Sequence, residues 1–144
     1  MKKQSGITLV ELLVVVVIMG IITSIALPSY REYMIRANRV DAKAALLEIA
    51  AAQEEWYLQN NSYTTTLGSG GLNLSGISKY KNYTVAIESA SATDYIASAT
   101  AREGQASDEE CPVFAIDALG RKFGGKKPIS KANNDEDCWG LYGS

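Results

Sequence analysis

The side chains that could carry chemistry in this chain of 144 residues do not include histidine. Its absence excludes imidazole acid–base catalysis, Ser-His-Asp and Cys-His nucleophiles, and most zinc sites. Carboxylates occur as two contiguous runs, Asp108-Glu109-Glu110 and Asp135-Glu136-Asp137. Such runs are more typical of a solvated surface than of two carboxylates placed for acid–base work. The sequence therefore predicts a protein that is not an enzyme and has no cofactor.

Near the carboxyl end the chain contains a cluster of cations: Arg121, Lys122, Lys126, Lys127 and Lys131. The whole chain has a net charge of −2, which excludes a protein that coats nucleic acid generally. A lysine-rich loop can still hold duplex phosphates without sequence preference. Phe123 is the one aromatic residue among these cations, so reading of single strands by stacking is poorly supported. The alternative is a solvated loop whose cations offset the flanking acidic runs.

The element that positions everything else is an apolar run from residue 7 to 27, which follows a polar leader with two lysines. As a helix, this run spans about 31 Å, roughly the thickness of the hydrocarbon core of a bilayer. Cations before such a span keep the leader in the cytoplasm and direct the rest of the chain outward. We expect a single-pass membrane helix. The alternative is a secretory signal peptide cut near residues 24–26.

Glu11 lies inside this apolar run and argues against a signal peptide. A carboxylate within a membrane helix costs on the order of 2–3 kcal/mol near its centre and less toward an end. The run itself contains no cation to pair with it. Cleavage between Gly6 and Ile7 would create an α-amine about 6 Å from Glu11 along the helix of the same chain. In a staggered neighbouring subunit, that amine could lie beside the Glu11 carboxylate. Glu11 thus indicates a helix that later joins an assembly.

The segment Gly6-Ile7-Thr8-Leu9-Val10-Glu11, followed by the apolar helix, resembles the class III signal of type IV pilins. The resemblance extends to about residue 63. It implies that prepilin peptidase cuts after Gly6 and methylates the new amine of Ile7, where the family more often has Phe. Glu11 is then the fifth mature residue, which in the family pairs with the amino terminus of a neighbouring subunit.

Gly20 and Pro28 bracket the softest part of the predicted helix, because glycine costs about 1 kcal/mol in a helix interior and proline removes a hydrogen bond. Pro28 also matches the helix-bending proline of type IV pilins. Members of that family can unwind between these positions inside the filament. A simple kink is the alternative.

Beyond Pro28 the apolar residues recur at three- and four-residue intervals: Tyr30, Tyr33, Met34, Ala37, Val40, Ala44, Leu47 and Ala51. We expect this stripe to pack on the globular domain and the helix to end near residues 59–61. Residues 64–79 are rich in Gly, Ser and Thr and predict a loop. Strands are expected at 83–89, 95–101, 113–117 and 121–123. The predicted fold is α+β: a long amino-terminal helix packed on a roughly four-stranded antiparallel sheet, as in the type IV pilin fold.

The expected divisions of the chain are a leader at 1–6, a hydrophobic helix at 7–28 and a globular domain at 29–144. Within that domain we expect a helix at 29–60, a loop at 61–81 and a sheet at 82–123. Cys111 and Cys138 are the two cysteines, and two distant cysteines in an exported protein oxidise more often than they stay as free thiols. The resemblance implies a disulfide that bounds the D-region, residues 111–138, a surface loop containing the cation cluster.

Asp135 and Asp137 offer hard oxygen ligands of the kind that calcium prefers. Pseudopilins of type II secretion systems carry a calcium site near the carboxyl end, but there the metal usually replaces the disulfide. The spacing of these aspartates also matches no recognised calcium loop. We therefore predict no metal site.

These observations predict a structural subunit of a type IV pilus, either major or minor, that polymerises through its amino-terminal helix. The resemblance implies other pilin subunits and prepilin peptidase as partners. It places the chain in the bacterial inner membrane with a periplasmic carboxyl terminus, and then in an extracellular pilus that supports adhesion, twitching motility or DNA uptake. Extracellular DNA and host or other surfaces are further candidate partners. The alternatives are a pseudopilin of a type II secretion system and a competence minor pilin that captures DNA.

Overall fold

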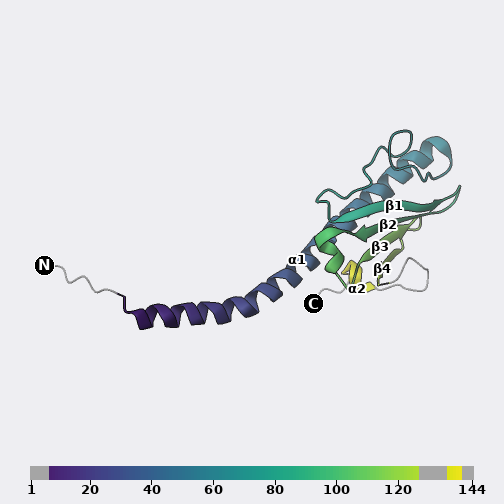
Figure 1. The fold of residues 1–144 in the computed structure, drawn as a ribbon. Coiled ribbons are helices and arrows are strands. Elements are labelled where there is room, and N and C mark those ends of the chain that lie inside the picture. The colour runs from purple at the N-terminus through teal and green to yellow at the C-terminus, as the bar shows by residue number, and fades with distance from the viewer. Residues whose placement is uncertain (1–6, 127–135, 141–144) are drawn as a thin grey trace. The chain divides into compact units, whose positions relative to one another are not determined.

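The computed structural model describes residues 7–126 and 136–140, and Figure 1 labels their helices and strands. Its elements are helix α1 (Leu9–Asn60), strands β1 (Tyr83–Ala90) and β2 (Tyr95–Ala101), a 3-10 helix (Glu103–Ser107), strands β3 (Val113–Asp117) and β4 (Lys122–Gly125), and the short helix α2 (Glu136–Trp139). The chain divides into two compact units between Met34 and Ile35, and each is described by itself.

The first unit is the apolar half of α1. None of its described residues is buried, including the large apolar side chains from Ile7 to Tyr33. By length and composition α1 is suited to cross a membrane. The helix is unbroken at Gly20 and Pro28. The hydroxyl of Thr23 donates to the carbonyl oxygen of Met19 at 2.8 Å, and Ser24 donates to that of Ile21 at 2.7 Å. These polar side chains are therefore satisfied within the helix.

The second unit contains one antiparallel sheet with the strand order β1-β2-β3-β4. Its register pairs Tyr83 with Ala101, and Ala99 with Phe114. A register irregularity in β1 falls between Ile87 and Ser89. This sheet, with the long helix, confirms the predicted α+β architecture. The predicted strands are present, with β4 shifted by one or two residues from its predicted range.

The core lies between α1 and one face of the sheet, where alternate strand residues are buried. These residues, together with the helix residues that cover them, are Tyr83, Val85, Tyr95, Ala97, Ala99, Phe114, Ile116, Ala42, Leu46 and Ile49. All buried residues in the described parts of the chain have numbers of 41 or higher. The globular domain thus has a core of its own, made without the apolar half of α1.

The prediction that the apolar stripe of α1 packs on the domain is wrong. Tyr33, Val40 and Leu47 are 69%, 64% and 51% exposed. The residues of α1 that are buried are Asp41, Ala42, Leu46, Ile49 and Gln53. The reason is that α1 has apolar residues on two sides, and the side that faces the sheet also contains polar residues. Periodicity alone favoured the side with more large apolar residues.

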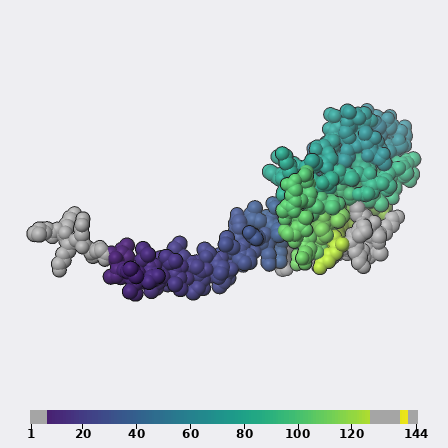
Figure 2. All heavy atoms as spheres, in the orientation of Figure 1, coloured from purple at the N-terminus to yellow at the C-terminus, as the bar shows by residue number. Residues whose placement is uncertain are grey.

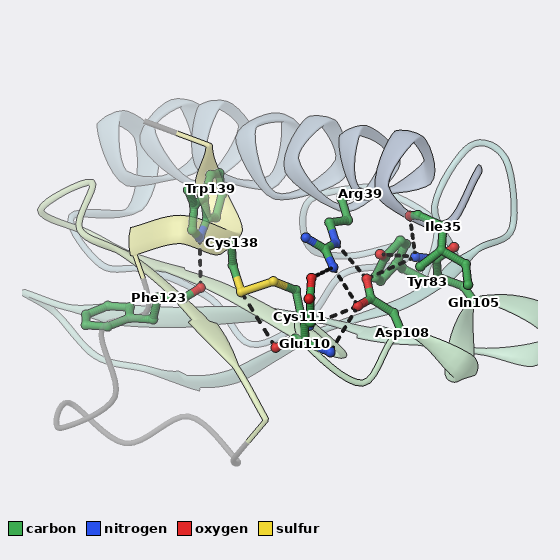
Figure 3. Close-up of a disulfide and its surroundings, with 10 residues drawn as sticks. All are labelled: Ile35, Arg39, Tyr83, Gln105, Asp108, Glu110, Cys111, Phe123, Cys138 and Trp139. Atoms are coloured by element: carbon green, nitrogen blue, oxygen red, sulfur yellow. Dashed lines mark hydrogen bonds and ion pairs between the residues drawn. A yellow bond between two sulfur atoms is a disulfide. The ribbon is translucent and has the colours of Figure 1, made fainter. Parts of the chain in front are cut away.

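The carboxyl-terminal helix is fixed by a disulfide between Cys111 and Cys138, whose Cα atoms are 5.7 Å apart (Figure 3). The indole Nε1 of Trp139 donates a hydrogen bond of 2.8 Å to the carbonyl oxygen of Phe123 in β4. The Trp139 ring also meets the Phe114 ring edge to face, with centroids 5.9 Å apart. A Cβ atom at Gly124 would lie 2.8 Å from that of Cys138, so this close approach of α2 to β4 requires glycine.

We expect loss of the disulfide to lower the free energy of unfolding of the globular domain. The bridge closes a loop with a sequence separation of 27, and a loop of this size stabilises by roughly 3.5 kcal/mol on the chain-entropy estimate. The measurement is urea denaturation of the wild type and of the Cys111→Ser/Cys138→Ser variant, each with and without reductant. Reductant should bring the wild type to the stability of the variant and leave the variant unchanged. Equal stability of all four samples would contradict the prediction.

Candidate functional site

A buried ion pair joins α1 to the segment that leads into β3. The guanidinium of Arg39 donates to both carboxylate oxygens of Asp108, at 2.7 and 2.8 Å, and to Glu110 at 2.9 Å. The side chains of Arg39 and Asp108 are 13% and 1% exposed, whereas that of Glu110 is 62% exposed. Figure 3 shows this pair beside the disulfide. Because the Arg39–Asp108 contact is bidentate and largely shielded from water, it fixes the position of the segment more firmly than a surface pair would.

Gln105 extends this network across the same boundary (Figure 3). Its amide nitrogen donates to the carbonyl oxygen of Ile35 at 2.9 Å and to the hydroxyl oxygen of Tyr83 at 3.0 Å. Its amide oxygen accepts a hydrogen bond of 3.1 Å from Asn38. Gln105 is 2% exposed, so its polar atoms have protein partners in place of water. The network holds α1, β1 and the 3-10 helix together.

The charge of Asp108 is stabilised by these contacts. Burial opposes its ionisation, but hydrogen bonds from Arg39 and from the backbone N–H groups of Cys111 and Glu110 outweigh that effect and hold its pKa below the usual value. Burial raises the pKa of Tyr83 to about 12, so its phenol stays neutral. The prediction that residues 108–110 form a solvated run is therefore wrong for Asp108. Its partner Arg39 is 69 residues away in the chain, and no local pattern could indicate the pairing.

The predicted cation cluster does not form one surface in the described part of the chain. The guanidinium of Arg121 contacts the carboxylate of Asp117 at 2.6 Å. Lys122 is paired in register with Ile116, which faces α1, and its Nζ lies 5.4 Å from the centre of the Trp139 ring. Phe123 is 8% exposed, so it is not available for stacking on bases. Lys127 and Lys131 lie outside the described residues.

Lys126 is the exposed member of the cluster that follows β4 directly. It lines a surface hollow of about 550 Å³ with Glu88, Ile96, Ser98, Thr100, Pro112 and Val113. The lining residues of β2 alternate with those that face α1, so the hollow lies on the opposite face of the sheet. Lys122 and Lys126 consequently lie toward different faces. Lys126 has no carboxylate within ion-pair distance among the described residues.

At the start of α1, Glu11 and Thr8 cap the helix for each other. The Glu11 carboxylate accepts hydrogen bonds from the backbone N–H of Thr8 at 3.0 Å and from its hydroxyl at 2.9 Å. The Thr8 hydroxyl accepts one of 3.3 Å from the backbone N–H of Glu11. This is a capping box, and the Thr-x-x-Glu spacing was the sequence signal for it. Ile7 is exposed, while Gly6 lies outside the described residues.

The described residues 7–126 and 136–140 contain no group of three or more His, Cys, Asp or Glu side chains that could hold a metal ion. Asp135 and the side chain of Asp137 lie outside the description.

Two family models match the chain. One, described as the type IV minor pilin ComP, DNA uptake sequence receptor, matches residues 28–115. The other, the prokaryotic N-terminal methylation motif, matches residues 1–27. The chain belongs to the ComP family of type IV minor pilins. This membership confirms the predicted pilin fold with its methylation motif, and it confirms a structural protein that is not an enzyme.

The chain is also similar to several curated proteins. A probable minor fimbrial protein of Dichelobacter nodosus is 42% identical over 49% of this chain and 42% of its own length. The type IV wide pilus major component PilA4 of Thermus thermophilus is 35% identical over 66% of this chain and 72% of its own. The type II secretion system core protein G of Aeromonas hydrophila is 35% identical over 45% of this chain and 46% of its own length. The chain thus matches less than half the length of some of these relatives.

Among solved structures, the non-core minor pilin PilV of Neisseria meningitidis superposes with a TM-score of 0.53 at 18% identity. The match covers 68% of this chain and 93% of that one. It supports the fold described above.

We expect Asp108→Asn to destabilise the domain by about 2–3 kcal/mol at neutral pH, because it leaves the shielded Arg39 charge with only the exposed Glu110 as a partner. Since the folded-state pKa of Asp108 is lowered, its contribution is complete above about pH 4 and is lost as the pH falls through the folded-state pKa. Denaturant titrations between pH 2 and 7 should show a shallower loss of stability in acid for the variant. Exposed Glu109→Gln is the matched control and should behave as the wild type. The same acid profile for both variants would contradict the prediction.

Proposed function

We propose that this minor pilin binds extracellular DNA through its globular domain while its amino-terminal helix is held in a filament. The observation that carries the proposal is the match of residues 28–115 to a family described as a DNA uptake sequence receptor. The matched segment runs from within α1 into β3. It therefore includes most of the described globular domain.

The residue that we assign to phosphate contact with most support is Lys126, because it is exposed and has no carboxylate within ion-pair distance in the described structure, although Glu88 lines the same hollow. Thr100 adds a hydroxyl in the adjoining hollow. Lys127 and Lys131 follow in the sequence and would extend a basic segment. Arg121 and Lys122 are weaker candidates, since one is paired with Asp117 and the other lies over Trp139. Binding of this kind is electrostatic and depends steeply on salt.

Membership in a pilin family implies peptidase processing, insertion in the membrane and then assembly in a pilus. In this chain we assign cleavage and methylation to Gly6 and Ile7, which makes residues 1–6 the leader. We assign filament packing to the helix at 7–28, with Gly20 and Pro28 as its soft segment. Glu11 would exchange its Thr8 contacts for the amino terminus of a neighbour. The exposed Val40 and Leu47 then offer apolar surface to adjacent subunits.

A pseudopilin of a type II secretion system is the second candidate, supported by the similarity to core protein G of Aeromonas hydrophila. The disulfide between Cys111 and Cys138 favours the pilus, because pseudopilins of that kind usually have calcium in its place. Metal analysis of the purified oxidised protein separates the two. Bound calcium at one equivalent would favour the pseudopilin.

We expect Lys126→Ala to weaken duplex binding on all sequences alike and to reduce the slope of log affinity against log salt by about one. The measurement is fluorescence anisotropy of a labelled duplex with the full chain in a non-ionic detergent, at several salt concentrations. Lys126→Arg is the matched control, which preserves the charge and should preserve the slope. Absence of wild-type binding near physiological salt would overturn the proposal of DNA binding. An unchanged slope in Lys126→Ala would remove this residue from the contact.

A second prediction concerns assembly. Glu11→Ala should leave export and cleavage intact but stop incorporation into filaments, because the neighbour's α-amine loses its partner in a non-aqueous environment. The readouts are mobility of the processed subunit on gels and its yield in sheared filaments. Val10→Ala, one residue away, is the control and should give normal filaments. A normal yield from Glu11→Ala would refute the charge-pair argument.

A further inference from the structure

The turn that leads into β1 displays an aromatic ring between two lysines. Tyr80 is 70% exposed, and its neighbours Lys79 and Lys81 are also exposed. The Nζ atom of Lys79 lies 5.6 Å from the centre of the Tyr80 ring. None of these three residues belongs to the cation cluster near the carboxyl end. The combination is well suited to duplex DNA, because ammonium groups bind phosphates while an exposed ring can make apolar contact with base edges in a groove.

The position of this turn is set by a buried carboxylate of α1. Asp41 is 5% exposed, and its oxygens accept hydrogen bonds from the Ser78 hydroxyl at 2.7 Å, the backbone N–H of Tyr80 at 3.2 Å and the backbone N–H of Asn82 at 3.3 Å. The Asn82 side-chain amide donates a further one at 3.3 Å. In the described residues Asp41 takes part in no ion pair. Burial of a carboxyl group is costly unless donors surround it, and here the donors belong to the turn.

Two further contacts close the turn. The backbone N–H of Lys81 donates to the carbonyl oxygen of Ser78 at 3.0 Å, and that of Arg102 donates to the carbonyl oxygen of Asn82 at 2.9 Å. Lys81 has a φ of +63°, a region that residues other than glycine seldom adopt. Such a conformation persists only where the surroundings determine it. The turn is therefore a fixed structure that displays Tyr80. The nearby Arg102 is paired with Glu103 at 2.6 Å, so Lys79 and Lys81 are the cations of this region that we consider for phosphate binding.

We propose that the Lys79-Tyr80-Lys81 turn is a second DNA contact of this protein, which Asp41 holds in position. Lys79 and Lys81 bind backbone phosphates, and the Tyr80 ring packs against the sugars and base edges between them. Asp41 is a positioning residue, since it contacts the turn and has no contact with DNA. This inference rests on the proposed DNA binding and adds to it a surface formed by the turn that leads into β1.

The test separates the ring from the charges through the salt dependence of duplex binding by the full chain in a non-ionic detergent. Tyr80→Ala should lower affinity at least about fivefold without changing the salt slope, because a ring contact releases no counterions. Tyr80→Phe should bind as the wild type. Lys79→Ala and Lys81→Ala should each reduce the slope by about one. The matched control is Tyr33→Ala, which removes a ring that is 69% exposed but has no flanking lysine, and should leave affinity unchanged.

The role of Asp41 is tested by a double-mutant cycle. Asp41→Asn should lower affinity in the wild type but have no further effect in a variant with Lys79, Tyr80 and Lys81 all replaced by Ala, because its effect passes through the turn. A merely structural role would instead lower affinity equally in both backgrounds, and that result would overturn the positioning role. Thermal unfolding of each variant checks that the domain is folded.

The outcomes distinguish this inference from the proposal on which it rests. No binding by the wild type would overturn both. Suppose that the wild type binds and Lys126→Ala weakens binding, but Tyr80→Ala, Lys79→Ala and Lys81→Ala leave affinity and slope unchanged. That result would overturn the second contact and leave DNA binding in place. A loss of affinity in Tyr80→Ala for single-stranded DNA, with unchanged affinity for duplex, would overturn the duplex contact.

Discussion

The structure depends on one constraint: α1 is apolar on two sides, yet only one of them can face the sheet. Apolar packing alone would not decide between the sides, because large apolar side chains occur on both: Leu46 and Ile49 are buried, whereas Val40 and Leu47 are exposed. The decision comes from polar residues. Arg39, Asp41 and Gln53 each bind a different segment of the domain, and Gln53 does so by exchanging hydrogen bonds of 2.7 and 3.1 Å with the backbone of Thr64. Each buried group would be costly without its partner, so only one rotation of the helix satisfies all of them.

The segment before β3 is fixed from two directions. Asp108 binds Arg39 of α1, while Cys111, three residues later, is bonded to Cys138 of α2. The backbone N–H of Cys111 also donates to Asp108 at 3.0 Å, which connects the two restraints. The contrast between them is chemical, because the ion pair responds to acid and the disulfide to reductant. This segment, which belongs to the green part of the chain in Figure 2, is thus held by restraints that fail under different conditions.

Regular features were predictable from the sequence because they depend on neighbours in the chain. The apolar run predicted the membrane-length helix, and the alternation of side chains predicted β1, β2 and β3. The resemblance to type IV pilins predicted the disulfide. The orientation of α1 was not predictable, since it depends on contacts such as Arg39 with Asp108, 69 residues apart. The dispersal of the cation cluster was hidden for a similar reason. Whether Lys122 and Lys126 share a surface depends on strand register and on the position of Trp139.

The polar contacts of α1 also have a mechanical meaning. A load applied along the helix axis reaches the rest of the domain partly through Arg39, Asp41 and Gln53, which are bound to separate segments. Bonds arranged in this way share the load, and all of them must break before the helix can slide. A domain attached by apolar contacts alone could slide along the helix in small displacements, because such contacts are not directional. In this protein, directional bonds from α1 to three segments outside the strands oppose sliding of the helix along the domain.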